Sequence, residues 1–449
     1  MTTTHLPVVV IGAGPAGLAA AAHLAGRDLE AVVLEAGTAA GAAVTEWGHV
    51  RLFSAWTELI DPAARDLLAP TGWVEPDPAA YPTGSDWVAS YLQPLADALG
   101  SVRYRHRVTA VTRESRDRLV SSGRDDAPFT VHVTGPDGPH HVMAAAVIDA
   151  SGTWSGPNPL GGDGVPAIGE LVHADRISYR LPDLGDPAAR ARYGGRHVVV
   201  AGTGASAKGA LIGLARLAEE VPGTRVSWLV RRSSVDEAFA GSGQDELPER
   251  GALGQRAAAA VAEGPVTTFG GFRTSTVESQ ADGRLAVTSF DGQRIEGVDE
   301  VIALTGFRPD LSIETEIRLD LDPILEAPRE LAPLIDPNVH SCGTVPPHGA
   351  AELAQPEARF YLVGMKSYGR ATSFLALTGF EQTRSVVASI AGDHDAAARV
   401  ELTLPETGVC GGSGAFDDTT ASAGSCCGGP TGPQLIALSG PPSPSGASS

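Results

Sequence analysis

Short runs of consecutive apolar residues recur along this chain, separated by glycine-rich turns and by stretches of alanine and leucine. The first run, residues 8–11, leads through the turn GAGPAG into an alanine- and leucine-rich stretch and then into a second apolar run at residues 31–34. Continuous apolar runs of this length are typical of strands buried on both faces, as in a parallel sheet. The pattern therefore predicts a strand, a tight turn, a helix and a second strand parallel to the first.

The turn after the first run has the glycine spacing of a dinucleotide cradle. Gly12 permits the tight turn, Gly14 lets the backbone approach a pyrophosphate, and Gly17 lets the helix pack close to its strand. Glu35 follows the second run at the spacing at which a carboxylate reaches a ribose hydroxyl. An ordinary tight turn would also use glycine, but the strand, the helix and the acid together favour nucleotide binding.

The same pattern returns near the middle of the chain. Residues 197–207, HVVVAGTGASA, give another apolar run and a second turn that contains Gly202, Gly204 and Ser206. An alanine-rich stretch follows and predicts a second helix. The sequence therefore predicts two successive dinucleotide-binding units.

The two units differ in the charge that follows their second strand. The run RVSWLV at residues 225–230 is followed by Arg231 and Arg232, where the first unit has Glu35. A guanidinium there pairs with a ribose 2′-phosphate that a carboxylate would repel. The first unit therefore predicts FAD and the second predicts NADPH, while a solvated strand end is the alternative explanation of the arginine pair.

Both units close in the same way, with an apolar run and a small-residue turn: VIDASG at residues 147–152 and VIALTG at residues 301–306. Residues 359–392 offer one more buried strand and a long helix, which complete the first unit if the second is inserted into it. We expect single strands over residues 102–111 and 140–152 in the first unit and over residues 293–306 in the second.

These elements predict an α/β fold with two Rossmann-like dinucleotide-binding domains of three-layer ββα architecture, the NADPH domain being inserted into the FAD domain. Near the C-terminus the composition changes to a mixture of Gly, Ser, Thr, Ala and Pro that cannot bury enough surface to order itself. The predicted boundaries are residues 1–160 and 305–396 for the FAD domain, 161–304 for the NADPH domain and 397–449 for a flexible Gly/Ser/Cys tail.

Charge and cysteine content restrict the environment and the partners. The chain of 449 residues has a formal net charge of −20, which argues against nucleic acid and anionic membranes because both attract clustered cations. No Lys or Arg precedes the first apolar run, so we expect neither a signal peptide nor a membrane span. Only Cys342 of four cysteines precedes residue 410, which indicates a reducing, cytoplasmic location. The residues leave open whether the chain forms a homodimer.

With both glycine turns in view, the chain resembles the two-dinucleotide-binding-domain flavoproteins, and among them the class B flavin monooxygenases. The segment IGELVHADRISY is similar to the fingerprint FxGxxxHxxxY of those enzymes, with Gly169 and His173 at the right spacing. It departs at Ile168, which directly precedes the glycine where the pattern has a Phe two residues earlier, and at Tyr179, which lies six residues after the histidine rather than four. A linker histidine at a domain junction is the alternative.

Four further segments resemble the flavin-dependent monooxygenases of arsenic-resistance gene clusters. Thioredoxin reductases, the nearest competing branch, would need a CxxC near the flavin, and the sequence contains none. The resemblance spans nearly the whole chain and implies an NADPH-dependent FAD monooxygenase that uses molecular oxygen on a small nucleophile such as a trivalent arsenical. The four segments are WGHVRLFSAW, YPTGSDW, IDPNVHSCGTVPPHG and GMKSYGRATSFLALTGFEQTRSVV.

The resemblance also implies further contacts with the cofactors. Trp47 and the backbone near Val108 would lie against the FAD, and Gly364 would follow the last strand of the FAD domain. Thr305 and Gly306 would pass the junction between the two cofactors.

Arg51 is the one catalytic candidate. It lies in an aromatic stretch that in this fold passes the isoalloxazine ring, where a cation would stabilise the reduced, anionic flavin. A surface arginine on a loop is the alternative. Met365 stands where related reductases carry an aspartate for the ribitol, so backbone amides would have a larger share in holding the cofactor.

The tail thiols form a second constellation. Cys410, Cys426 and Cys427 could supply three soft thiolates to As(III) or a similar thiophilic ion, and the alternative is that they are incidental. His340, Cys342 and His348 could suggest another metal site, but Pro346 and Pro347 interrupt the spacing and no fourth ligand is evident, so an ordered loop near the flavin is favoured there.

Three functions follow from these residues. The first is the monooxygenase described above. The second is an FAD- and NADPH-dependent reductase that passes electrons through the tail cysteines to a metalloid or a disulfide. The third is a metalloid-binding protein without turnover, whose nucleotide domains are structural.

Overall fold

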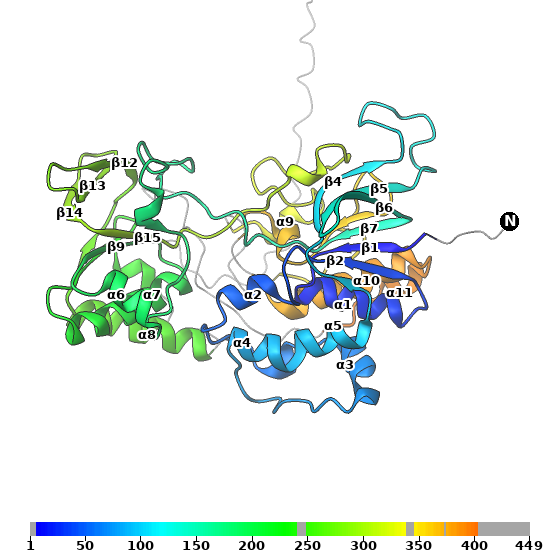
Figure 1. Cartoon of the computed structure of the whole chain (residues 1–449), viewed down its shortest axis with the longest axis horizontal. Coiled ribbons are helices and arrows are strands. Elements are labelled where there is room, and N and C mark those ends of the chain that lie inside the picture. The colour runs from blue at the N-terminus through cyan, green and yellow to red at the C-terminus, as the bar shows by residue number, and fades with distance from the viewer. Residues whose placement is uncertain (1–5, 240–247, 338–344, 372–373, 403–449) are drawn as a thin grey trace, which may run out of the picture. The chain divides into compact units, whose positions relative to one another are not determined.

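The structure is a computed structural model that describes residues 6–239, 248–337, 345–371 and 374–402. Within these residues the chain forms two α/β lobes, each with a five-stranded parallel sheet and a three-stranded antiparallel sheet (Figure 1). The first lobe contains the parallel sheet that begins at Val8, and the second lobe contains the parallel sheet formed between Ile177 and Ala303. This arrangement confirms the predicted fold class.

The first lobe takes strands from distant parts of the chain. Its central strand β1 (Val8–Ile11) pairs in parallel with β2 (Ala31–Leu34) and with β7 (Ala146–Asp149). β3 (Val102–Arg103) extends the sheet beyond β2, and β16 (Phe360–Leu362) extends it beyond β7. Because β16 joins this sheet after the whole second lobe, the second lobe is inserted into the first. The exact domain boundaries stay a prediction.

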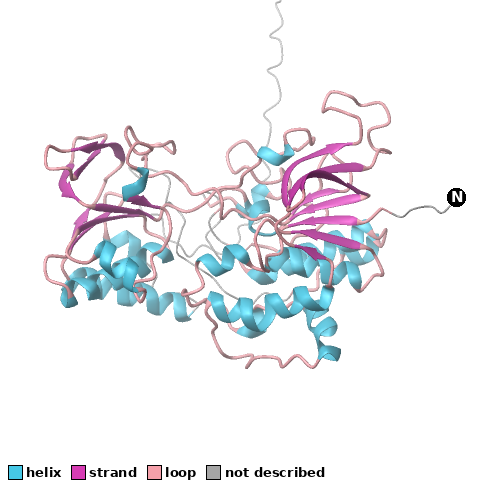
Figure 2. Cartoon of the chain, viewed as in Figure 1, coloured by secondary structure: helices cyan, strands magenta, loops and turns pink. Residues whose placement is uncertain are grey.

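Successive residues of the central strand β1 point to opposite faces of the sheet. Val8 and Val10 pack in a core formed with helices, and Val9 and Ile11 pack in a core formed with the antiparallel sheet. Both faces are therefore buried, which explains the unbroken apolar run. The covering elements are α1 (Pro15–Ala25), α3 (Pro62–Leu68), α5 (Gln93–Leu99) and α10 (Ala376–Ile390) on one face, and β4 (Arg107–Arg113), β5 (Phe129–Gly135) and β6 (Gly138–Ala144) on the other (Figure 2).

The second lobe repeats these three layers. Val198, Val200 and Trp228 pack against helices, whereas Val199 and Leu229 pack against the antiparallel sheet. The parallel sheet has the order β11 (Val266–Phe269), β10 (Arg225–Leu229), β9 (His197–Ala201), β15 (Glu300–Ala303) and β8 (Ile177–Ser178). The layers beside it are α6 (Pro187–Tyr193), α7 (Ala205–Glu220) and α8 (Pro248–Glu263), and the sheet of β12 (Thr274–Ser279), β13 (Leu285–Ser289) and β14 (Arg294–Val298).

The three long strands expected from the sequence are each divided into two strands that belong to different sheets. Residues 102–111 divide at Arg105, whose φ of 60° turns the chain from β3 into β4. Residues 140–152 divide at Ala145, between β6 and β7, and residues 293–306 divide at Asp299, between β14 and β15. The prediction of single strands was wrong because a strand must bend to pass from one layer to the next.

The shorter described helices are α2 (Ala42–Glu46), α4 (Gly84–Trp87), α9 (Ala332–Ile335) and α11 (His394–Ala398). Among the described residues, no helix has the length and apolar character needed to span a membrane.

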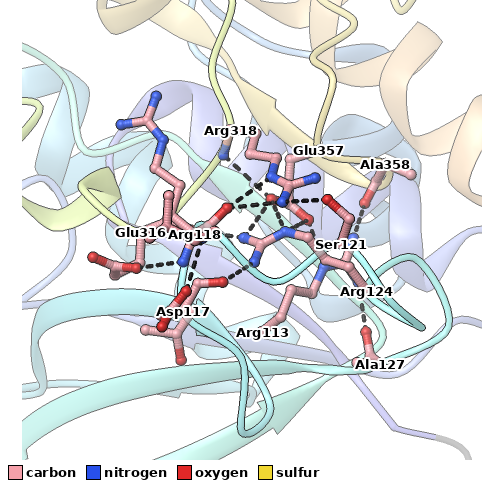
Figure 3. A network of polar contacts seen from close by, with 12 residues as sticks. Arg113, Asp117, Arg118, Ser121, Arg124, Ala127, Glu316, Arg318, Glu357 and Ala358 are labelled. Atoms are coloured by element: carbon pink, nitrogen blue, oxygen red, sulfur yellow. Dashed lines mark hydrogen bonds and ion pairs between the residues drawn. The ribbon is translucent and has the colours of Figure 1, made fainter.

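A buried ionic network fastens the loop after β4 to the segment that leads into β16 (Figure 3). Glu357 is fully buried and accepts hydrogen bonds from Arg113 at 2.8 Å and from Arg124 at 2.7 Å, and each arginine side chain is only 2% exposed. Burial by itself would raise the pKa of Glu357, but the hydrogen bonds from Arg124 and Arg113 hold it below its usual value. Other N–H groups of the same two guanidinium groups donate to backbone carbonyls, those of Arg113 to Ala127 and Ala358 and those of Arg124 to Asp117 and Glu316.

We predict that Glu357→Gln lowers the free energy of unfolding by roughly 3–5 kcal/mol, because it leaves two buried guanidinium groups without a counter-charge. Urea denaturation followed by circular dichroism measures this loss. Since the folded-state pKa of Glu357 is depressed, its contribution is present above about pH 4.3, the usual pKa of Glu, and is lost as the pH falls through the folded-state value.

The matched control is Glu75→Gln, which removes a carboxylate from a surface pair with Arg65 in which both side chains are more than one third exposed. Such a pair contributes less than about 1 kcal/mol. Equal losses in the two variants would contradict the structural role given to the buried network.

Candidate functional site

The first glycine turn has a different steric reason for each of its three glycines. Gly12 has a φ of 96°, and a Cβ there would lie 2.9 Å from the carbonyl oxygen of Ala150. A Cβ at Gly17 would overlap the carbonyl oxygen of Gly12, so the first turn of α1 can pack on the turn only without a side chain. A Cβ at Gly14 would meet no atom within 4 Å. The turn is therefore closed on the protein side and open beside Gly14, at the N-terminus of α1.

Glu35 follows β2 and joins two loops at the edge of this turn. Its carboxylate accepts hydrogen bonds from the amide of Ala13 at 2.7 Å and from the amide of Gly37 at 2.6 Å. The side chain is half-buried. A carboxylate has about four lone-pair positions, so these two bonds leave acceptor capacity for a ribose hydroxyl.

The other predicted flavin contacts are spread over the first lobe. Trp47 is half-buried and lies against Gly84, where a Cβ would be 2.8 Å from the indole ring. Val108 is buried between the two sheets of the lobe, and a bulge follows it in β4. Arg51 is exposed, and its guanidinium donates to the carbonyl oxygen of Tyr81 at 2.6 Å. The structure thus places Arg51 on a surface loop, with a hydrogen bond to the backbone of a neighbouring segment.

Gly364, after β16, brings a distant part of the chain to the first glycine turn. Its φ is 67°, and a Cβ there would lie 2.9 Å from the side chain of Ala16 in α1. Its amide donates to Gln382 of α10 at 2.7 Å, and Gln382 in turn donates to the ring of buried His348. Burial lowers the pKa of His348, so the imidazole is neutral.

A buried charged cluster, which sequence reasoning missed, lies at the same edge of the sheet. Lys366 donates to Asp149 at 2.7 Å and to Glu314 at 2.6 Å, and all three side chains are at least 98% buried. We call these residues the Lys366 cluster. Lys366 also contacts the hydroxyl of the exposed Ser151 at 3.2 Å. The sequence signal was slight, since Lys366 stands within the loop GMKSY and Asp149 ends an apolar run.

The two carboxyl groups of the Lys366 cluster differ in their acidity. Burial and the nearby Asp149 raise the pKa of Glu314 to about 9. Burial opposes ionisation of Asp149 as well, but the charge of Lys366 and the hydrogen bonds from Glu314, Lys366 and Ser151 together outweigh it and lower the pKa of Asp149. At pH 7 the cluster therefore contains one carboxylate, one ammonium group and one protonated carboxyl group.

The second glycine turn repeats the geometry of the first. Gly202 has a φ of 118°, and a Cβ there would overlap the carbonyl oxygen of Leu304. Gly204 opens onto free space. Ala207, at the spacing that Gly17 has in the first turn, is buried, whereas the predicted Ser206 lies exposed in the first turn of the helix. A contact of Ser206 with the cofactor stays a prediction.

Positive side chains gather beyond β10, where Arg231 and Arg232 follow the strand. Arg232 lies 4.0 Å from Glu237. Loss of hydration and the nearby Arg273 guanidinium lower the pKa of Arg231. Arg273 precedes β12 and was not predicted from the sequence, because its proximity depends on the fold.

The segment that resembles the monooxygenase fingerprint is organised around a buried carboxylate. Glu170 accepts hydrogen bonds from the amides of Leu160 and Ala167 and from the hydroxyl of Tyr179. A Cβ at Gly169 would overlap the carbonyl oxygen of Val277. The Tyr179 hydroxyl thus binds Glu170, and the half-exposed His173 takes no part in that bond.

Thr305 and Gly306 lie in the segment that leaves the second lobe, and both bind Asn158 in the segment that enters it. The hydroxyl of Thr305 donates to the carbonyl oxygen of Asn158 at 2.8 Å, and the amide of Asn158 donates to Gly306 at 2.9 Å. The predicted tail ligands Cys410, Cys426 and Cys427, together with His340 and Cys342, lie outside the described residues. Within the described part of the chain, no group of three or more His, Cys, Asp or Glu side chains could hold a metal.

Comparisons with known proteins agree with this geometry. The family model described as pyridine nucleotide-disulphide oxidoreductase matches residues 9–341. No curated protein sequence matches the chain. The family match confirms the prediction of an oxidoreductase that uses FAD and a pyridine nucleotide.

Solved structures share the fold at low sequence identity. Bacillithiol disulfide reductase from Bacillus cereus is 21% identical, with a TM-score of 0.63 over 87% of this chain and 99% of that one. The FAD-bound cadaverine monooxygenase DfoA from Erwinia amylovora is 13% identical, with a TM-score of 0.62 over 94% and 100%. Ornithine N-hydroxylase from Kutzneria sp. 744 is 19% identical, with a TM-score of 0.54 over 87% and 100%. Reductases and monooxygenases thus share this architecture.

The geometry of the first glycine turn predicts that alanine substitutions at two of its glycines affect different properties of the protein. Gly14→Ala should leave the unfolding temperature of the flavin-free protein within about 2 °C, because its methyl meets no protein atom, but should weaken FAD binding since the backbone there approaches the pyrophosphate. Gly17→Ala should lower the stability by roughly 1–3 kcal/mol through its clash with Gly12. Thermal unfolding and flavin fluorescence titration measure the two effects. Loss of stability in Gly14→Ala would contradict the assignment of the open side.

Proposed function

Because the chain belongs to the pyridine nucleotide-disulphide oxidoreductase family, we propose that it is an NADPH-dependent FAD monooxygenase that oxygenates a small nucleophilic substrate. The observation that carries the proposal is the pair of dinucleotide turns with opposite charges beside them. Glu35 stands at the first turn, and Arg231 and Arg232 stand at the second.

FAD fits the first lobe. The open side at Gly14 gives a dinucleotide pyrophosphate access to the backbone at the positive end of α1. Glu35 would accept hydrogen bonds from the adenosine ribose, and Trp47, Val108 and Gly364 would complete the site. When bound, FAD supplies the group that accepts hydride from NADPH and then reacts with oxygen.

NADPH fits the second lobe. Gly204 opens onto the N-terminus of α7 in the same manner as Gly14 does at α1. Arg231 and Arg232, with Arg273 close to the first of them, would bind the 2′-phosphate. Thr305 and Gly306 would line the passage between the cofactors, and Arg51 would face the reduced flavin as a stabilising cation.

A monooxygenase is favoured over a dithiol reductase because the chain contains no CxxC that could relay electrons from the flavin. A trivalent arsenical is the proposed substrate, since Cys410, Cys426 and Cys427 supply three soft ligands for it. The vicinal pair Cys426 and Cys427 also supports a second candidate, a metalloid or disulfide reductase that uses the tail thiols.

If the protein is a monooxygenase, an arsenite or organic nucleophile should accelerate its oxidation of NADPH. The reaction should then consume about one O₂ per NADPH. An oxygen electrode and the absorbance of NADPH measure the ratio. Anaerobic turnover that disappears in a Cys426→Ser/Cys427→Ser variant would favour the reductase. Tight As(III) binding together with no NADPH oxidation in the presence of any tested substrate would contradict both the monooxygenase and the reductase.

The arginines beside the second turn predict a substitution that raises the KM for NADPH much more than the KM for NADH. Arg231→Ala should raise the KM for NADPH by roughly 10- to 100-fold, the equivalent of about 1.5–3 kcal/mol for a charged hydrogen bond. The KM for NADH should change less than about twofold, because NADH has no 2′-phosphate. Steady-state kinetics with both cofactors give the comparison, and Arg284→Ala, an exposed arginine paired with Asp282, is the control. Equal effects on NADPH and NADH would contradict the assignment.

A further inference from the structure

The Lys366 cluster lies directly behind the first glycine turn. Asp149 pairs in register with Ile11, the last residue before Gly12. Ser151, whose amide donates to Asp149 at 2.9 Å, has its Cα 3.3 Å from the position of a Cβ on Gly12. The hydroxyl of Ser151 reaches Lys366 on one side, and the residue is exposed on the other. Ser151, an exposed residue, therefore lies between the cluster and Gly12 of the glycine turn.

The total charge of the cluster depends on Glu314 alone among its members. Lys366 and Asp149 cancel each other, so the cluster is neutral when Glu314 is protonated and carries one negative charge when it is ionised. One oxygen of Glu314, Oε2, is buried and faces no donor group, and Glu314 and Asp149 share a side-chain hydrogen bond that requires a proton between the two carboxyl groups. A neutral carboxyl group tolerates such burial much better than a carboxylate does. The remaining acid nearby is Asp310, whose pKa the Ser312 hydrogen bonds and Lys366 both lower, so it stays ionised.

We propose that the Lys366 cluster belongs to the FAD site and that the protein takes up one proton, held by Glu314, together with the cofactor. The proposal rests on FAD binding in the first lobe. The diphosphate of FAD is a dianion, and a negative charge behind the glycine turn would repel it. Near and above pH 9, flavin-free protein with ionised Glu314 combines with FAD and one proton from the solvent to give the bound protein with neutral Glu314, whereas at pH 7 Glu314 is already protonated and no proton is taken up.

FAD binding and protonation of Glu314 are coupled, and the coupling acts equally in both directions. If FAD binds better to the protonated form, bound FAD must raise the affinity of Glu314 for its proton by the same factor. Affinity is then constant below about pH 8 and declines as Glu314 ionises in the flavin-free protein, near the pKa of about 9. Couplings of this kind are typically about 5- to 150-fold. Glu314 and Lys366 are thus positioning residues that act on the cofactor through the turn.

The test is an FAD titration of the flavin-free protein between pH 6.5 and pH 10, followed by the quenching of flavin fluorescence. Wild type should keep a constant Kd up to about pH 8 and weaken at least fivefold by pH 10. Glu314→Gln, which is neutral at every pH, should match the wild-type Kd at pH 7 within about twofold and lack this weakening. Glu316→Gln, two residues away and outside the cluster, should follow wild type.

The outcomes separate this inference from the proposed function. Equal weakening in Glu314→Gln and wild type would overturn the inference and leave FAD binding intact. Absence of FAD binding at pH 7 would overturn the proposed function and the inference with it. If Glu314→Gln does not fold, calorimetry of the wild type in buffers of different ionisation enthalpy decides. Proton uptake on FAD binding at pH 9, with none at pH 7, supports the inference, and no uptake at either pH refutes it.

Discussion

A close contact between backbones organises each lobe of this protein. At the end of the central strand, a glycine with positive φ lies against the carbonyl of the segment that leaves the neighbouring strand: Gly12 against Ala150, and Gly202 against Leu304. Any side chain at either glycine would push the two segments apart. Because both strands end at the same edge of a parallel sheet, the contact closes that edge on one side and leaves the adjoining helix N-terminus open on the other.

The two lobes share this backbone and differ in the charges placed around it. Glu35 is held by two amides at the first turn, while Arg231 and Arg232 follow the corresponding strand of the second. In a chain with a net charge of −20, adjacent arginines near a third, Arg273, make a local exception to the overall charge. The same scaffold therefore suits two different dinucleotides, of which only NADPH carries a 2′-phosphate.

Features that depend on local geometry could be predicted from the sequence, and features that depend on the path of the chain could not. The glycine turns and the doubly buried strands follow from spacing and apolar runs. The strand predicted through Arg105 failed because only the tertiary fold shows that the chain changes layer there. Arg273 and the Lys366 cluster were missed for a related reason: Asp149, Glu314 and Lys366 are far apart in the sequence and meet only when β16 returns to the first sheet.

The two buried ionic groups of the first lobe show how a structural cluster differs from one that belongs to a site. Around Glu357, two guanidinium groups share one carboxylate, and backbone carbonyls satisfy their remaining hydrogens. Around Lys366, the carboxyl groups of Asp149 and Glu314 share a hydrogen bond that needs one proton, and the group touches an exposed serine beside the glycine turn. The Glu357 carboxylate, whose pKa is lowered, stays ionised at neutral pH, whereas the raised pKa of Glu314 makes the charge of the Lys366 cluster depend on pH. Its position at the edge of the sheet where the strands end is what gives this titratable cluster a functional explanation.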